Sequence, residues 1–359
     1  MQDLKVFKIL SAEKMCPHFL SISRGGKNSD LPIETILDED GKKFDLNSLN
    51  NHVTNFYSEL YRPDPDTGGS IEDFLGPAIC NSPLVQGSIL TEQEKNELDM
   101  PLSPLELEKS LNSSNLKSAP GRDGYSYRII KKFWPLFKKP LLLCALEGLE
   151  NNSLPESFKE ADIKIIPKKG DTTKIKNWRP ISLLSNFYKI VSRAINERLK
   201  KISNRILSRA QKGFNQKRYI HEVLINVFET IDYCKRENIQ GAIVSIDQSK
   251  AFDSVDHLYM EKVYNFFGFG EKIKKWLLAI GTNRKARICL GNNNYTDYFP
   301  LGRGHAQGDS PSPLLYNFAA QILLFKIELT EKVARIRCDH SFPGKNSNPL
   351  EPFLNESNK

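Results

Sequence analysis

Hydrophobic residues recur along this chain at spacings that separate helices from strands. Over residues 181–199 an apolar stripe follows helical spacing, with Lys189, Arg193 and Arg198 on the opposite face, which predicts an amphipathic helix. The same spacing predicts helices over 46–60, 220–238, 254–267, 271–281 and 312–329. Short runs rich in β-branched or aromatic residues predict strands over 162–167, 242–247, 286–290 and 295–300. This mixture predicts an α+β fold.

The stretches between these elements suggest how the chain is divided. Residues 1–62 are expected to form a lead-in segment, and 63–100 a linker, because its first part is rich in Pro, Gly, Asp and Ser. Hydroxyl-to-glutamate spacings at 91–94 and 103–106 are typical of helix starts. Residues 331–359 carry no periodicity and are expected to be a disordered tail.

Composition narrows the class of protein. Hydrophobic residues make up 39% of the chain and charged residues 26%, which is typical of a soluble globular protein. No apolar run is long enough to span a membrane, and no basic region followed by an apolar one occurs at the N-terminus, so we do not expect secretion. The six cysteines lie far apart, without a Cys-x-x-Cys pair, so we expect reduced thiols in an intracellular protein. Nucleus and cytoplasm are not distinguished.

Charge is distributed unevenly along the chain. Residues 1–100 hold 9 Lys and Arg against 17 Asp and Glu, whereas residues 101–240 hold 27 against 14. A basic middle third beside an acidic first third favours a localised surface for binding phosphates. A solvated Lys-rich surface is the plainer alternative.

The most informative segment is the predicted strand over 242–247, which ends in Asp247. A carboxylate at the end of a buried strand is held rigidly while it still reaches solvent, which suits a metal ligand. An Asp that caps the next helix is an equally good interpretation of this residue alone.

Several other motifs occur in a fixed order around that segment. They read Ser-Ala-Pro-Gly-Arg-Asp-Gly at 118–124, Ile-Ile-Pro-Lys-Lys-Gly-Asp at 165–171, Asn-Trp-Arg-Pro-Ile-Ser-Leu-Leu at 177–184, Gln-Lys-Gly-Phe at 211–214 and Gly-Arg-Gly-His-Ala-Gln-Gly-Asp at 302–309. Together they resemble the reverse transcriptases of non-LTR (LINE-like) retrotransposons, from about residue 117 to about residue 329.

The resemblance implies an RNA-directed DNA polymerase that adds deoxynucleotides to a primer 3′ hydroxyl. Its ligands would be an RNA template, a DNA primer, deoxynucleoside triphosphates and Mg²⁺. By resemblance Asp247 is the first catalytic aspartate and a metal ligand, and the backbone carbonyl of Gln248 assists it. Asp253 and Asp256 lie near the expected start of the next helix, where we expect them to act as caps.

The resemblance also suggests which residues bind the nucleotide. Phe252 stands where the family places a bulky residue under the sugar, so its ring would exclude a 2′ hydroxyl, although a core aromatic is the alternative. Lys168 and Arg179 match basic positions that grip the triphosphate.

The template side is suggested by Gln307 and Gly308. The amide of Gln307 would hydrogen-bond near the templating base, and Gly308 would let backbone and nucleic acid approach closely. In the family the next residues usually read Asp-Pro-Leu-Ser-Pro, but here residues 309–313 read Asp-Ser-Pro-Ser-Pro. We expect this shift to alter the loop that enters the helix without abolishing the helix.

One family feature is missing from the sequence. The family's paired aspartates are absent, because no Asp-Asp dipeptide occurs in the 359 residues. The expected architecture is therefore right-hand polymerase fingers over 101–240 and a partial palm over 241–330, without a thumb. The chain is interpreted as a fragment of a retrotransposon polyprotein, by truncation, decay or domestication. A catalytically inactive nucleic-acid-binding remnant is the alternative, and the oligomeric state is not indicated.

Overall fold

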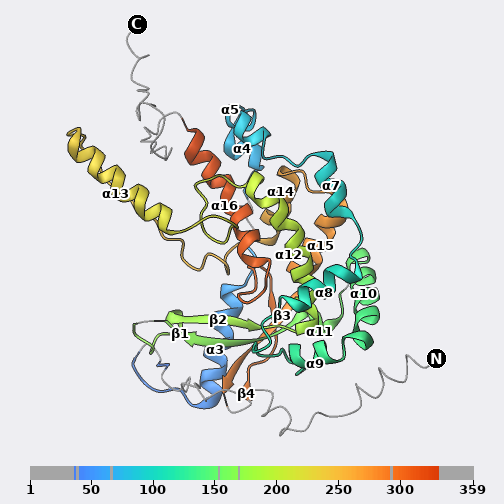
Figure 1. Ribbon diagram of the computed structural model, residues 1–359. Helices are drawn as coiled ribbons and strands as arrows, with labels where there is room; N and C mark the ends of the chain where they lie inside the picture. Colours follow the sequence, from blue (N-terminus) through green and yellow to red (C-terminus); the bar gives the residue numbers. More distant parts are fainter. Residues whose placement is uncertain are drawn as a thin grey trace.

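The computed structural model describes residues 36–37, 40–64, 68–152, 154–168, 170–291 and 294–330, and all structural statements below concern these residues. They form an α+β fold in which one small sheet lies below a group of packed helices (Figure 1). No described helix combines the length and the hydropathy that crossing a membrane requires. The predicted tail over 331–359 and most of the lead-in lie outside the described residues.

The sheet has the strand order β2-β1-β3-β4, and β5 also pairs with β3. β1 runs antiparallel to β2, parallel to β3, and β3 runs antiparallel to β4 and β5. The strands are β1 (Glu160–Pro167), β2 (Trp178–Leu183), β3 (Arg284–Gly291), β4 (Asn294–Tyr295) and β5 (Phe299–Leu301). The strands predicted over 162–167, 286–290 and 295–300 are thus confirmed in place, the last as two short strands.

Helices account for most of the remaining described residues. Those that precede β2 are α3 (Leu46–Leu60), α4 (Ile71–Leu75), α5 (Pro77–Cys80), α6 (Pro83–Gln86), α7 (Glu92–Asp99), α8 (Pro104–Asn112), α9 (Tyr127–Lys132), α10 (Trp134–Glu150), α11 (Glu156–Lys159) and the short 3-10 helix η2 (Ile175–Asn177). Those that follow β2 are α12 (Asn186–Ile206), α13 (His221–Arg236), α14 (His257–Phe266), α15 (Glu271–Gly281) and α16 (Ser312–Leu329).

Helix starts follow the local chemistry that the sequence indicates. Thr91 and Glu94 form a reciprocal capping box at the start of α7, and Ser103 and Glu106 form another at α8. Each box satisfies backbone N–H groups that have no partner inside the helix. The predictions for these two helix starts, and for the extents of α3, α15 and α16, are confirmed.

The stretch expected to be a linker is instead ordered. Within 63–100 the chain forms α4 to α7, and Ile71, Leu75, Val85 and Leu98 are buried in the main core. Ser70 and Ser82 cap two of these helices, so the Ser-rich composition marks short capped helices rather than a flexible connection.

The helix predicted over 181–199 begins later in the structure, and one residue of its predicted polar face is buried. Residues 178–183 form β2, and α12 starts at Asn186. Its apolar stripe is core, as expected, but Arg198 on the supposed solvent face is only 7% exposed. A long Arg side chain can bury its stem and still reach partners with its head, which a polarity pattern does not register.

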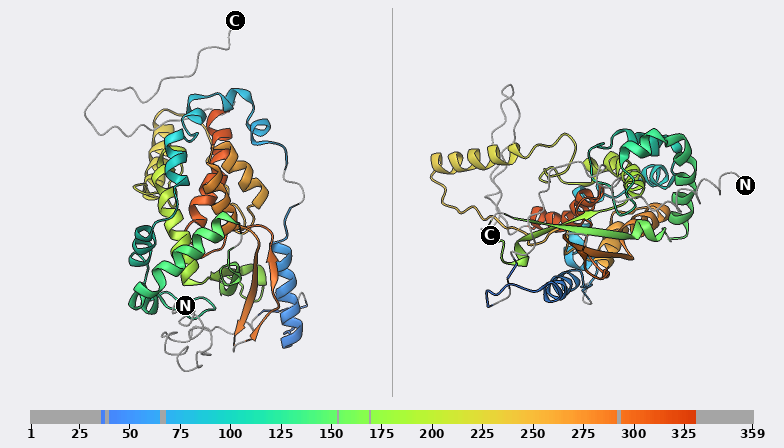
Figure 2. Two further views of the ribbon diagram at one scale, coloured as in Figure 1. Left: turned by 90° about the vertical axis from the view of Figure 1, so that its right-hand side faces the viewer. Right: turned by 90° about the horizontal axis from the view of Figure 1, so that it is seen from below.

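The prediction of a strand over 242–247 is wrong. Residues 237–249 form no strand, and all of them are exposed, including Val244 at 77% and Ile246 at 88%. A strand must exchange backbone hydrogen bonds with a neighbour, and none of the described strands pairs with this segment. α13, which precedes it, projects from the body and has no buried residue (Figures 1 and 2).

Candidate functional site

Two loops that carry predicted site residues are fastened to each other. The Gly304 N–H donates to the Val255 carbonyl and the His305 N–H to the Phe252 carbonyl, both at 2.7 Å. Gly304 has φ +87°, and a Cβ there would lie 2.7 Å from the Asp253 carbonyl oxygen. Only glycine fits this approach without strain. The segment after Asp247 and the loop before Gln307 are therefore one unit.

A buried carboxylate lies at the centre of this unit. Asp253 is 2% exposed and accepts hydrogen bonds from the Tyr61 hydroxyl at 2.9 Å and the Gln307 amide nitrogen at 2.8 Å. Burial raises the pKa of Asp253, and both hydrogen bonds oppose that rise. The expectation that Asp253 caps a helix is wrong, whereas Asp256 does cap α14 by accepting from two backbone N–H groups.

Sequence reasoning missed Tyr61 and Asp253 as a pair because no local signal connects them. They are 192 positions apart, and Asp253 is 54 positions from Gln307. Only the fold brings the end of α3 to this loop.

The backbone around Gln307 is held by the sheet. The Gln307 carbonyl accepts from the Ser182 N–H of β2 at 2.8 Å. Gly308 has φ +118°, and a Cβ there would lie 2.9 Å from the Ser182 carbonyl oxygen. The close approach that Gly308 permits is therefore to the protein's own strand. Its predicted approach to nucleic acid remains a prediction.

The predicted basic pair lies at one end of the β1–β2 hairpin. Arg179 pairs with Ile166 across the two strands, and Lys168 follows directly after β1. Both side chains are exposed. The charge of Lys168 contributes to lowering the pKa of Asp253 against the effect of burial, which places it near the fastened loops. The structure thus brings Lys168 and Gln307 to the same region.

A second lysine in this region was not predicted. Lys250 adopts φ +51°, and its ammonium nitrogen lies 4.4 Å from the centre of the Phe56 ring of α3. The nitrogen is buried without a hydrogen-bond partner. Burial lowers the pKa of Lys250, and the charge of Asp253 opposes this effect. α3 therefore contributes an aromatic face as well as the Tyr61 hydroxyl.

Phe252 lies in an aromatic cluster beside these loops. Its ring is half-buried and packs against the Phe214 ring at 6.1 Å and the Tyr316 ring of α16 at 5.2 Å, between centres. The Tyr316 hydroxyl donates to the Gln248 side-chain oxygen at 2.6 Å. Phe252 is therefore half-buried and is not among the residues of the buried core.

Asp247 lies on the exposed segment and is not enclosed by other carboxylates. Burial raises the pKa of Tyr316 and the charge of Asp247 adds to this rise, so the two residues are neighbours. The described part of the chain contains no group of three or more His, Cys, Asp or Glu that could hold a metal ion. The described residues alone therefore do not fit a two-metal site, which needs shared carboxylates.

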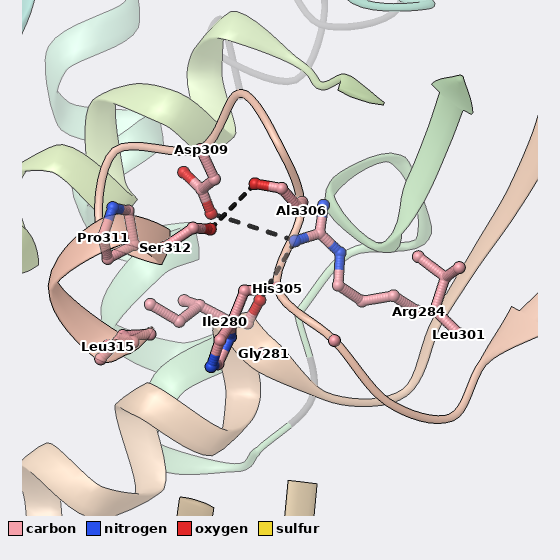
Figure 3. Close-up of a pocket in the computed structure, with 11 residues that line it drawn as sticks. Ile280, Gly281, Arg284, Leu301, His305, Ala306, Asp309, Pro311, Ser312 and Leu315 are labelled. Atoms are coloured by element: carbon pink, nitrogen blue, oxygen red, sulfur yellow. Dashed lines mark hydrogen bonds and ion pairs between the residues drawn. The ribbon is translucent and has the colours of Figure 1, made fainter. Parts of the chain in front are cut away.

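The loop that carries Gln307 rests on a buried polar cluster (Figure 3). Asp309 accepts from the Tyr188 and Ser192 hydroxyls of α12, at 2.5 and 2.6 Å, and lies 4.0 Å from Arg284. Arg284 and Asp309 line a cavity of about 20 Å³, large enough for one water molecule. Burial lowers the pKa of His305 beside it to about 3, so this imidazole is neutral. α16 forms beyond the loop despite the shifted Pro, as expected.

The chain is similar in sequence to several known proteins. Residues 166–338 match the family described as reverse transcriptase (RNA-dependent DNA polymerase). The chain is 30% identical over 301 residues, 83% of its length, to the transposon TX1 uncharacterized 149 kDa protein of Xenopus laevis, of which this covers 22%. It is 32% identical over 248 residues, 66% of its length, to the RNA-directed DNA polymerase from mobile element jockey of Drosophila melanogaster, of which this covers 26%.

A third similar protein also comes from a transposable element. The chain is 29% identical over 216 residues, 59% of its length, to a Pol polyprotein from the type-1 retrotransposable element R2 of Popillia japonica, of which this covers 29%. The chain thus spans roughly a quarter of the length of these curated relatives. With the motif order and the fastened loops, these likenesses lead to one conclusion: the chain carries a LINE-like reverse transcriptase domain of the non-LTR retrotransposon class.

Proposed function

We propose that this chain binds an RNA template, a DNA primer and an incoming deoxynucleoside triphosphate for RNA-directed DNA polymerisation. In this proposal residues 101–240 are the fingers and residues 241–330 part of the palm. The observation that carries the proposal is the position of Gln307, which is fixed by Asp253 and by β2 in the same region as Lys168. A rigid amide beside an exposed cation suits a site where base and triphosphate lie close together.

Each predicted residue has a definite task in this proposal. Lys168 and Arg179 bind triphosphate oxygens, Lys168 as a point charge and Arg179 as a planar fork. Phe252 excludes a 2′ hydroxyl by occupying the space under the sugar. Gln307 contacts the template strand, and Gly308 shapes the turn that presents it.

Asp247 and Gln248 are the residues that would meet a divalent metal. When bound, Mg²⁺ would supply activation of the primer hydroxyl and stabilisation of the leaving pyrophosphate. Magnesium takes one or two carboxylates with waters and substrate phosphates, so Asp247 can supply one ligand, but the described residues contain no group of three or more His, Cys, Asp or Glu that could hold the ion.

This shortage of carboxylates favours a second candidate function, binding of nucleic acid without chemistry. Primer extension with Mg²⁺ and all four deoxynucleotides tests whether the 359 residues alone catalyse the reaction. We expect no product above background for the 359 residues alone, and robust extension would exclude the binding-only candidate.

Binding of a labelled RNA template annealed to a DNA primer tests both candidates together. We expect little sequence preference and an affinity that falls steeply as salt rises, because phosphate contacts release counterions. Binding that does not respond to salt, or no binding at low salt, would contradict the proposed nucleic-acid surface.

A further inference from the structure

The carboxylate of Asp253 determines which way the Gln307 amide points. Its Oδ1 accepts from the Tyr61 hydroxyl at 2.9 Å and its Oδ2 from Gln307 Nε2 at 2.8 Å. An ionised carboxylate has no proton to donate, so the amide must turn its nitrogen toward Asp253. The carbonyl oxygen of Gln307 lies in the same amide plane on the opposite side of Cδ, so it points away from that carboxylate oxygen.

We propose that Tyr61 and Asp253 are positioning residues that make Gln307 present its carbonyl oxygen to the template strand. The group it would accept from is a hydrogen-bond donor of that strand, either a ribose 2′ hydroxyl or a base N–H. This inference rests on the template contact proposed for Gln307. It adds the direction of the hydrogen bond and two residues that set it.

Tyr61 is held firmly enough to act in this way. Its carbonyl accepts from the Gly302 N–H at 2.9 Å, and the Leu60 carbonyl accepts from Arg303 Nε at 2.8 Å. The Tyr61 ring also stacks on Phe299 of β5, with centres 6.3 Å apart. The end of α3 is therefore tied to the strand and loop that lead to Gln307, although it lies outside residues 166–338 that match the family.

The charges around Asp253 favour its ionised form. Burial raises the pKa of Asp253, while the hydrogen bonds from Tyr61 and Gln307 and the charges of Lys250 and Lys168 oppose that rise and stabilise the carboxylate. Replacing Asp253 with Asn keeps the shape but adds a donor. The Asn amide can then donate to the Gln307 oxygen, which would turn the Gln307 nitrogen toward the template.

Equilibrium binding tests the inference with Asp253→Asn, Gln307→Ala and the double variant. The probes are a fluorescein-labelled RNA template on a DNA primer, with an unpaired template end, and an all-DNA duplex of the same sequence. We expect Asp253→Asn and Gln307→Ala each to weaken RNA-template binding about tenfold, the effect of one hydrogen bond. The double variant should bind no more weakly than Gln307→Ala, because Asp253 acts through Gln307.

Asp256→Asn is the matched control, because it removes the same charge three positions away and Asn still caps α14. It should leave binding unchanged. Every variant is measured well below its own Tm, and Tyr61→Phe, which removes one donor without changing charge, is used if Asp253→Asn does not fold. We expect Tyr61→Phe to weaken binding in the same direction.

The outcomes separate this inference from the proposed function. If Gln307→Ala leaves binding unchanged, the proposed template contact is wrong and the inference falls with it. If Gln307→Ala weakens binding but Asp253→Asn does not, or weakens it equally in the Gln307→Ala background, Asp253 does not position Gln307 and only the inference is overturned. A loss confined to the RNA probe supports a 2′ hydroxyl donor, and a loss with both probes supports a base donor.

Discussion

Arg198 of α12 and Glu106 of α8 form a two-point ion pair, with Nε to Oε1 at 2.6 Å and Nη2 to Oε2 at 2.8 Å. The side chain of Arg198 is 8% exposed and that of Glu106 is 29% exposed. The same guanidinium donates to the Leu98 and Pro101 carbonyls and lies over the Trp276 ring. One side chain thus joins α12 to the ends of α7 and α8 and to α15.

Removing the charge of Glu106 should destabilise this junction. Glu106→Gln leaves the Arg198 guanidinium buried without its carboxylate, so we expect the free energy of unfolding to fall by about 3 kcal/mol. Urea denaturation at neutral pH measures the loss. Glu108→Gln is the control, because Glu108 pairs with Lys138 near the surface and should matter little.

The pH dependence of that loss has a definite sign. Burial raises the pKa of Glu106, but the hydrogen bonds from Arg198 and Ser103 outweigh it, and its pKa lies below the ordinary 4.5. Its contribution to stability is therefore present above pH 4.5 and is lost as pH falls through the folded-state pKa. The difference between wild type and Glu106→Gln should shrink on acidification. A difference that grew toward low pH would contradict the assignment.

Several correctly predicted helices have local determinants. The extents of α15 and α16 follow from apolar spacing, and the starts of α7 and α8 from capping boxes. The sequence could not show that 242–247 lacks a strand partner, because pairing depends on which strands the fold brings alongside it. The pattern of polar positions likewise placed Arg198 on the polar face, because such a pattern carries no information about distant carbonyl acceptors.

The candidate site likewise has residues that the sequence motifs indicate and partners that only the fold reveals. Motif order pointed to Lys168 and Gln307, which the structure places in one region. Asp253 was assigned to capping because its position near a helix start is a local cue. Its actual partners, Tyr61 and Gln307, are distant in sequence and are brought to it only by packing.

Reversing the basic pair should separate nucleotide binding from duplex binding. Lys168→Glu combined with Arg179→Glu replaces two exposed cations at the end of the β1–β2 hairpin, and we expect triphosphate affinity to fall about tenfold or more. Duplex affinity should fall less, because other basic residues share that contact. Lys131→Glu combined with Lys132→Glu changes the charge equally on α9 and serves as the control. Equal losses of triphosphate affinity in both double variants would argue against a specific triphosphate site.

Removing the ring of Phe252 should relax selection of the sugar. Phe252→Ala opens the space that the ring fills, so competition binding should show ribonucleotides approaching the affinity of deoxynucleotides. Tyr316→Phe keeps the neighbouring ring and loses only the contact to Gln248, so sugar selection should persist. If Phe252→Ala instead unfolds the protein in a thermal melt, the ring serves as core.

The exposed apolar segment before Asp247 should make this polypeptide prone to self-association. Val244 and Ile246 are 77% and 88% exposed on a segment that forms no strand, and exposed apolar residues of this kind can associate with other chains. Val244→Lys combined with Ile246→Lys should raise the monomer fraction in sedimentation velocity at high concentration. Leu105→Lys, which changes a single exposed apolar residue on α8, should not. An unchanged monomer fraction in the Val244→Lys, Ile246→Lys variant would show that this segment is not the cause of association.

Photo-crosslinking of the template tests directly whether the Gln307 loop faces the template strand. A thiouridine is placed at the first unpaired position of an RNA template annealed to a DNA primer, and the irradiated complex is digested with trypsin. Since cleavage follows Arg303 and Lys326, the Gln307 loop and most of α16 fall in one peptide, residues 304–326. We expect the main adduct on this peptide, and we expect this adduct to be lost in excess unlabelled duplex. Adducts confined to the lysines of α9 and α10, with none on residues 304–326, would contradict it.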